Sequence, residues 1–138
     1  MKKVLITGSS SGLGLSLCDI FLNEGYEVYG ISKSPTPRKM QSCVLDLSNK
    51  EKVREVIPNF ISSCGVKEFD YVFLNAGVLG PIEKAVEVPL HKIEESFQIS
   101  VGSSKQILDF LFNNSINVKT VIGISSGAAN RPYDGWLS

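Results

Sequence analysis

The sequence predicts an α/β fold: a doubly wound parallel sheet of five strands in the order 3-2-1-4-5, with helices on both faces. Short apolar runs alternate with stretches of helical periodicity along the chain, which is typical of repeated strand–helix–strand units. The runs are apolar on both faces, as strands covered by helices require. The length of 138 residues favours one domain, so we expect residues 1–138 to form a single unit.

The predicted strands are the five runs that combine high apolar content with β-branched or aromatic residues. They are "KVLIT" at 3–7, "YEVYGI" at 26–31, "CVLDL" at 43–47, "DYVFLN" at 70–75 and "KTVIGI" at 119–124. The proline-containing stretch "SKSPTPRK" at 32–39 is predicted to be a loop within the domain, because both of its flanks fit the same alternation.

A first helix is predicted between the first two strands. Leu13, Leu17, Ile20 and Phe21 recur at helical spacing, and Gly25 is expected to end the helix. These four apolar residues should form the face that packs on the sheet.

A second helix is predicted after the third strand. Ser48 and Glu51 have the spacing of a capping box, in which each side chain bonds the other residue's backbone. The apolar stripe of this helix is Val53, Val56 and Ile57. Pro58 is expected to end or kink the helix, because proline has no N–H to donate.

A long third helix is predicted over 89–113. It opens at Pro89, since proline is favoured in a first turn. Its apolar residues are expected to share one face: Leu90, Ile93, Phe97, Val101, Leu108 and Leu111. His91, the single histidine, is interpreted as a surface residue of this helix rather than a general base.

The composition is that of an ordinary soluble globular protein. Lys and Arg number 14, as do Asp and Glu, so a nucleic-acid partner is not favoured. No stretch approaches the roughly 18 apolar residues of a membrane span, no export signal is recognised, and we expect a cytoplasmic protein with no membrane partner. Cys18, Cys43 and Cys64 lack the spacing of a zinc site, so they are predicted to be free thiols and no metal is expected.

The stretch "TGSSSGLG", from Thr7 to Gly14, lies between the first predicted strand and the first predicted helix. Glycine permits a tight turn and lets a phosphate approach the backbone, while the helix directs free N–H groups at that point. The pattern therefore predicts an anion site. It is not a Walker loop, since no Gly-Lys-Ser/Thr follows, and a plain loop is the alternative.

Four motifs in order give the chain a resemblance to the short-chain dehydrogenase/reductase family. They are Thr7-Gly8-xxx-Gly12-x-Gly14, Asp46-Leu47, Asn75-Ala76-Gly77 and Ile124-Ser125-Ser126, each at the end of a predicted strand. The segment "ISSGAANRPYDGW" at 124–136 further resembles the benzil reductase and sepiapterin reductase branch. The family's full domain is longer, so the chain is similar to its N-terminal part, lacking the C-terminal part. The resemblance implies a Rossmann-type fold.

The resemblance also implies which residues hold a nicotinamide dinucleotide. Gly8, Ser10, Leu13 and Gly14 would hold the pyrophosphate, with Gly12 shaping the turn and Thr7 supporting it. Asp46 would accept a hydrogen bond from the adenine amino group, with Leu47 against the ring; a helix-capping role is the alternative for Asp46. Asn75, Ala76 and Gly77 would border the adenosine ribose, and Asn75 would also steady the central strands.

The end of the second predicted strand indicates NADP as the cofactor. It reads Gly30-Ile31-Ser32-Lys33-Ser34, without the acidic residue that binds the ribose hydroxyls of NAD. Ser32 can donate to a 2′-phosphate and Lys33 can neutralise it, with Arg38 as a third contact if the loop folds back. Lys33 and Arg38 could instead be solvated loop charges.

For catalysis, the resemblance implies reduction of a ketone, aldehyde or diketone, a small-molecule carbonyl substrate, by hydride transfer. Ser126 stands at the position of the family's Ser and would bond the carbonyl oxygen; a turn is the alternative reading of Ser125 and Ser126. Ser100 stands where the family has an Asn that relays protons through water, which puts that relay in doubt. Tyr133 and Trp136 either line the substrate pocket or pack elsewhere.

The family's catalytic Tyr follows its Ser by about thirteen residues, with a Lys four residues later, so both would lie beyond Ser138. Tyr133 does not replace this Tyr, because it is too close to Ser126 and Leu137 stands where the Lys is needed. We therefore expect residues 1–138 alone to be inactive. A second hypothesis is a nucleotide-binding sensor or regulatory module that has lost the chemistry. A homo-oligomer is compatible with either hypothesis.

Overall fold

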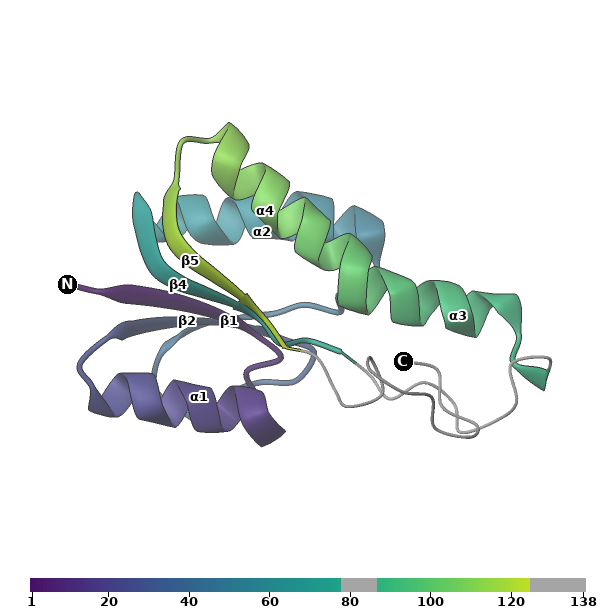
Figure 1. Ribbon diagram of the computed structural model, residues 1–138, viewed down its shortest axis with the longest axis horizontal. Coiled ribbons are helices and arrows are strands. Elements are labelled where there is room, and N and C mark those ends of the chain that lie inside the picture. Colours follow the sequence, from purple (N-terminus) through teal and green to yellow (C-terminus); the bar gives the residue numbers. More distant parts are fainter. Residues whose placement is uncertain (78–86, 125–138) are drawn as a thin grey trace.

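The computed structural model describes residues 1–77 and 87–124 of the chain. Its core is a five-stranded sheet in the order β3-β2-β1-β4-β5, in which every neighbouring pair is parallel. Figure 1 shows α1 on one face of this sheet and α2 with α4 on the other. The predicted doubly wound sheet and its strand order are therefore confirmed.

The strands begin and end within a few residues of the predicted runs. Their bounds are β1 (Lys3–Thr7), β2 (Glu27–Ser32), β3 (Gln41–Val44), β4 (Glu68–Leu74) and β5 (Asn117–Gly123). The largest difference is at β3, which ends at Val44, so that Leu45, Asp46 and Leu47 follow the strand instead of belonging to it. Leu45 and Leu47 are nevertheless buried, which explains why they read as part of a strand.

Helix α1 (Gly12–Asn23) lies where it was predicted, and Gly25 follows it with a positive φ of 82°. Its predicted apolar face is partly wrong, because Leu13 and Ile20 are more than half exposed. Gly14 and Cys18 are the buried residues of the helix. Gly14 and Cys18 lie against the turn of Gly8 and Ser9, whereas Leu17 and Phe21 pack against the apolar cluster between the sheet and α1.

Helix α2 (Lys50–Cys64) is capped by Asn49, whose Oδ1 accepts a hydrogen bond from the Lys52 N–H at 3.1 Å. The predicted capping box of Ser48 and Glu51 is therefore wrong. Pro58 does not end the helix, which continues to Cys64. The buried face of α2 includes Val53, Ile57 and Ile61, and packing of this face on the sheet offsets the hydrogen bond that proline cannot make.

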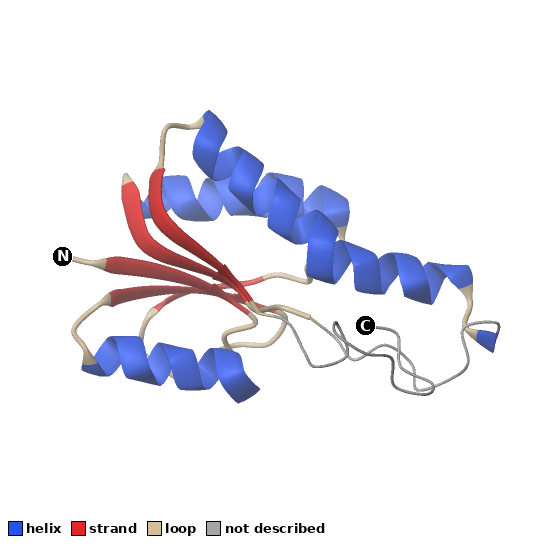
Figure 2. Ribbon diagram, in the orientation of Figure 1, coloured by secondary structure: helices blue, strands red, loops and turns tan. Residues whose placement is uncertain are grey.

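The helical segment predicted over 89–113 is divided into three parts. They are α3 (Leu90–Phe97), the π-helix η2 (Gln98–Gly102) and α4 (Ser103–Asn113) (Figures 1 and 2). The wider i→i+5 turn of η2 changes the rotation between α3 and α4, so one apolar face does not run along the whole segment. Ile107 and Leu111 of α4 are buried. The predicted apolar residues before α4 are exposed instead: Leu90, Ile93, Phe97 and Val101.

Two apolar clusters hold the layers together. The larger one lies between the sheet and the α2/α4 layer and includes Ile31, Ile57, Phe69 and Leu111. The smaller one lies between the sheet and α1, where Phe21 packs against the rings of Tyr26, Tyr71 and Phe73. With both faces covered, the free ends of the central strands are the places where a ligand can approach the backbone.

Within the described ranges, no helix is both long and apolar enough to cross a membrane. The same ranges contain no cluster of histidine, cysteine, aspartate or glutamate suited to a metal ion. All three cysteines are free. Burial raises the pKa of Cys18 to about 11, so this thiol stays protonated and inert at neutral pH.

Candidate nucleotide-binding site

A pocket of about 420 Å³ lies at the carboxyl ends of β1, β2, β3 and β4. At this edge the winding of the sheet reverses between β1 and β4. Ligands of doubly wound folds bind at such a point. Fourteen of the described residues line it: Gly8, Ser10, Ser11, Leu13, Ser32, Lys33, Ser34, Leu45, Asp46, Leu47, Asn75, Ala76, Gly77 and Ile99.

In the turn after β1, neighbouring atoms lie so close to Gly8 and Gly14 that neither position has room for a side chain. A Cβ on Gly8, whose φ is 70°, would lie 3.0 Å from Asn75 Nδ2 and 3.1 Å from Ala76 Cα. A Cβ on Gly14 would overlap the Gly8 carbonyl oxygen. The start of α1 can therefore pack on this turn only because both positions lack a side chain. Gly12 has a φ of 55° at the start of the helix, as a turn-shaping residue should.

Thr7 and Asn75 connect the ends of β1 and β4. Thr7 Oγ1 accepts hydrogen bonds from the backbone N–H groups of Asn75 at 3.0 Å and Ala76 at 2.8 Å. Asn75 Nδ2 donates to the carbonyl oxygens of Thr7 at 3.2 Å and Gly8 at 3.4 Å. The predicted supporting roles of Thr7 for the turn and of Asn75 for the central strands agree with these bonds.

Asp46 is held by its own loop. Its Oδ1 accepts from the Ser48 backbone N–H at 3.0 Å and from Ser48 Oγ at 2.7 Å. These bonds are the main reason why the pKa of Asp46 lies below its ordinary value, so the carboxylate is an ionised acceptor at neutral pH. Ser48 thus donates both hydrogen bonds to Asp46 and does not form the predicted capping box.

The end of β2 provides a hydroxyl and a cation. Ser32 is buried and its Oγ donates to the Ser34 carbonyl at 2.6 Å. Lys33 is largely exposed, with its Nζ 3.9 Å from Asp46 Oδ2, a weak surface pair. The cation is therefore available at the mouth of the pocket.

Arg38 is not brought to this pocket. Its guanidinium makes a two-point contact with Asp19 on α1, with Nε–Oδ1 at 2.6 Å and Nη2–Oδ2 at 3.1 Å. Asp19 lies six residues beyond Leu13 of the pocket wall, which is about 9 Å along the helix. The expectation that Arg38 adds a third phosphate contact thus does not match this arrangement.

The structure brings ten of the thirteen predicted nucleotide residues to the pocket wall. Thr7 and Gly14 lie against residues of that wall, and Gly12 is the first residue of α1. Ser100 in η2 lies beside Gly77, with its Oγ 3.8 Å from where a Gly77 Cβ would be. Ser126, Ser125, Tyr133 and Trp136 lie outside the described residues. His91 is exposed, as predicted.

Sequence reasoning missed four lining residues: Ser11, Ser34, Leu45 and Ile99. The first three are neighbours of predicted residues and could have been included for that reason. Ile99 could not be found from periodicity, because the helical pattern directed Phe97 and Val101 inward and the π-helix turns Ile99 to the pocket instead.

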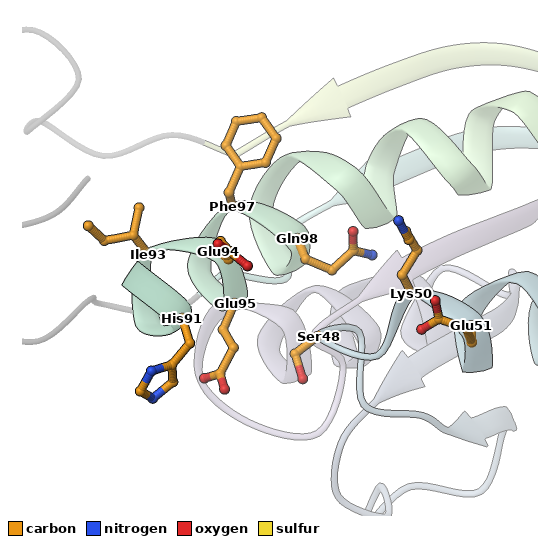
Figure 3. Close-up of a pocket in the computed structure, with 9 residues that line it drawn as sticks. All are labelled: Ser48, Lys50, Glu51, His91, Ile93, Glu94, Glu95, Phe97 and Gln98. Atoms are coloured by element: carbon orange, nitrogen blue, oxygen red, sulfur yellow. The ribbon is translucent and has the colours of Figure 1, made fainter. Parts of the chain in front are cut away.

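A second hollow, of about 540 Å³, lies between the start of α2 and the helix α3 (Figure 3). Its lining residues come from helices and from the β3–α2 loop: Ser48, Lys50, Glu51, His91, Ile93, Glu94, Glu95, Phe97 and Gln98. It is larger than the strand-end pocket but is not formed by the glycine turn or by the ends of the central strands. We assign the nucleotide site to the strand-end pocket for that reason.

A doubly wound parallel sheet with a glycine-rich turn and a strand-end pocket defines the class of dinucleotide-binding α/β proteins. Within this class, the profile of the short chain dehydrogenase family matches residues 2–138. The chain therefore belongs to that family, whose members are oxidoreductases.

Two similar proteins are reductases. It is 31% identical over 144 residues to a benzil reductase ((S)-benzoin forming) of Bacillus subtilis, covering 99% of this chain and 59% of that protein. It is 29% identical over 154 residues to an NADPH-dependent 3-dehydrocapnine reductase of Ornithobacterium rhinotracheale, covering 98% of this chain and 53% of that protein. The chain thus spans a little over half the length of these relatives.

Solved structures share the fold. A short-chain dehydrogenase/reductase from Burkholderia vietnamiensis superposes with a TM-score of 0.80 at 26% identity, over 97% of this chain and 67% of that chain. A short chain dehydrogenase family protein from Francisella tularensis gives a TM-score of 0.86 at 22% identity, over 99% of this chain and 56% of that chain.

Proposed function

We propose that the strand-end pocket binds NADP(H), and that the whole protein uses it to reduce a ketone, an aldehyde or a diketone. The observation that carries the proposal is the pocket itself, which joins the glycine turn, an ionised aspartate and an exposed lysine at one edge of the sheet. The similar NADPH-dependent reductase supports the choice of nucleotide.

The residues present fit a dinucleotide. A side chain on Gly8 or Gly14 would fill the closed turn, so backbone N–H groups at the start of α1 can face a pyrophosphate. Apolar residues, among them Leu47, Ala76 and Ile99, form walls against which a flat base can lie. Asp46 would accept from the adenine amino group, and Ser32 and Lys33 would hold a 2′-phosphate.

When bound, the nicotinamide ring supplies a hydride to a carbonyl carbon. The described residues bind and orient the nucleotide, whereas the group that would bond the carbonyl oxygen, Ser126, lies outside them. The resemblance implies a proton-donating tyrosine and a lysine that are expected beyond residues 1–138. We therefore propose that this span binds the nucleotide without completing the reaction. Nucleotide binding by a whole protein that reduces no carbonyl would favour the sensor hypothesis.

The nucleotide preference tests the proposal. We expect isothermal titration to show tighter binding of NADPH than of NADH by the unaltered protein. Lys33→Met should weaken NADPH binding by about tenfold, because a charge-assisted phosphate contact is lost. The same change should leave NADH binding nearly unchanged.

Arg38→Met is the matched control, since Arg38 is paired with Asp19 away from the pocket. We expect it to change the affinity for either nucleotide by less than twofold. Equal or tighter binding of NADH by the unaltered protein would contradict the NADP assignment.

A further inference from the structure

The two long walls of the pocket come from parts of the chain that the sheet does not connect. One wall is the β3–α2 loop with Leu45, Asp46 and Leu47. The other includes Ile99 of the π-helix η2. The distance between these walls sets the width of the slot in which a base would lie.

A chain of two hydrogen bonds joins the two walls. Gln98 Nε2, at the start of η2, donates to Gln106 Oε1 at 2.7 Å. Gln106 Nε2 in turn donates to the backbone carbonyl of Lys50 at 3.0 Å. Figure 3 shows the Gln98 side chain directed along its helix toward the start of α2, where Lys50 and Glu51 lie. The chain therefore spans the space between the helix pair and the first turn of α2.

Gly102 leaves room for this connection. Gln98 and Gln106 are eight residues apart, about 12 Å along a regular helix, so their side chains must extend toward each other over the residues between them. A Cβ on Gly102 would lie 2.9 Å from Gln98 Cδ and would overlap the amide oxygen. Any larger residue at 102 would displace the Gln98 side chain from the path to Gln106.

At Lys50, the chain of hydrogen bonds reaches the loop that holds Asp46. Lys50 is the first residue of α2 and stands two residues after Ser48. Ser48 donates two hydrogen bonds to Asp46, and the Asn49 N–H donates to the Asp46 carbonyl at 3.1 Å. A displacement of the first turn of α2 would therefore move the Asp46 carboxylate.

We propose that Gln98 and Gln106 are positioning residues of the nucleotide pocket, which hold the Asp46 carboxylate where it can accept a hydrogen bond from the amino group of an adenine ring. The inference rests on the proposed nucleotide function. It assigns these glutamines an effect on which base is bound, beyond an effect on stability.

The test compares two bases. NADPH carries the adenine amino group, whereas reduced nicotinamide hypoxanthine dinucleotide phosphate has an oxygen at that place. Gln106→Glu keeps the shape of the side chain but cannot donate to the Lys50 carbonyl. We expect it to weaken NADPH binding about fivefold, as the loss of one neutral hydrogen bond does, and to change binding of the hypoxanthine nucleotide by less than twofold.

Gln98→Glu breaks the same chain at its other end, so the same fall in adenine preference is expected and the conclusion does not depend on one variant folding. Lys105→Gln is the matched control, because Lys105 is exposed on the same helix and pairs only with Asp109 of that helix among the described residues. We expect this control to leave the adenine preference unchanged.

An equal loss of affinity for both nucleotides in the glutamine variants would overturn the inference, because a merely structural role weakens both alike. An unchanged preference would overturn it as well. If the unaltered protein binds neither nucleotide, the proposed function fails and the inference fails with it. Binding by the unaltered protein therefore separates the two failures.

Discussion

At the scale of the residue, the glycine turn is accounted for by steric contacts before any ligand is considered. Gly14 must lack a Cβ because the Gly8 carbonyl occupies that place, and Gly8 must lack one because of Asn75 and Ala76. A substitution such as Gly14→Asp therefore disturbs the turn as well as its charge. A test of the anion site needs a position where a side chain is already accommodated.

Ser10 is such a position, since its side chain is present and partly exposed at the pocket wall. Ser10→Asp is expected to weaken dinucleotide binding by at least tenfold, because it places a carboxylate against a pyrophosphate in a confined space. Ser10→Asn has almost the same shape without the charge and should retain most of the affinity. Titration of both variants with NADPH provides the measurement, and equal losses in the two would argue against an anion at this turn.

At the scale of the element, the sequence predicted the strands better than it predicted the helix faces. Strand β1 has its predicted limits, and β4 differs from its predicted run by two residues at the start and one at the end. Leu13 of α1 lines the strand-end pocket and is more than half exposed, and helical spacing alone does not distinguish a pocket wall from the core. In the same way, Pro58 was expected to end or kink α2, because periodicity says nothing about the packing that continues the helix.

In the candidate site too, residues at strand ends were predicted better than residues on helix faces. Residues that follow strand ends were found because parallel strands bring their carboxyl ends to one edge, whatever the details of packing. Ile99 was not found, because a π-helix changes the direction of a side chain without a sign in the apolar pattern. The pairing of Arg38 with Asp19 was not foreseen, because Asp19 is nineteen residues away in the chain.

The contact between α1 and the glycine turn leads to a prediction about stability. Gly14→Ala should lower the free energy of unfolding by about 1 to 3 kcal/mol, because the added methyl group must displace the Gly8 carbonyl. Urea unfolding measured by circular dichroism gives this value. Ser16→Ala, at an exposed position of the same helix, should change it by less than about 0.5 kcal/mol. An unchanged free energy of unfolding in Gly14→Ala would mean that the turn can move to accommodate the methyl group.

At the scale of the whole molecule, the two ends of the sheet have different chemistry. The carboxyl ends of the strands form the pocket, whereas the amino ends carry ion pairs that cross four strands. Lys3 Nζ pairs with Glu27 at 2.7 Å, and Lys119 Nζ pairs with Asp70 at 3.2 Å and with Glu68 at 3.5 Å. Acid should therefore weaken the sheet from the end opposite to the nucleotide site.

Asp70 is the residue on which this effect can be measured. Its carboxylate accepts the Lys3 backbone N–H at 2.9 Å and also faces Lys119, and these contacts hold its pKa below the ordinary value of 3.8. A carboxyl group whose pKa is lower in the folded state stabilises the fold above its unfolded pKa, and this contribution is lost as the pH falls toward the folded pKa. The loss should therefore begin near pH 4 and increase below it.

Asp70→Asn should make the protein less stable at pH 7 and reduce the difference in stability between pH 7 and pH 3, because the asparagine does not titrate. Urea unfolding at several pH values provides the measurement. Asp109→Asn is the control, since Asp109 pairs with Lys105 within one helix and connects no strands. If Asp70→Asn retained the full acid dependence of the unaltered protein, the contacts of Asp70 would not be its source. A reduced acid dependence with unchanged nucleotide affinity would show that the two ends of the sheet act separately.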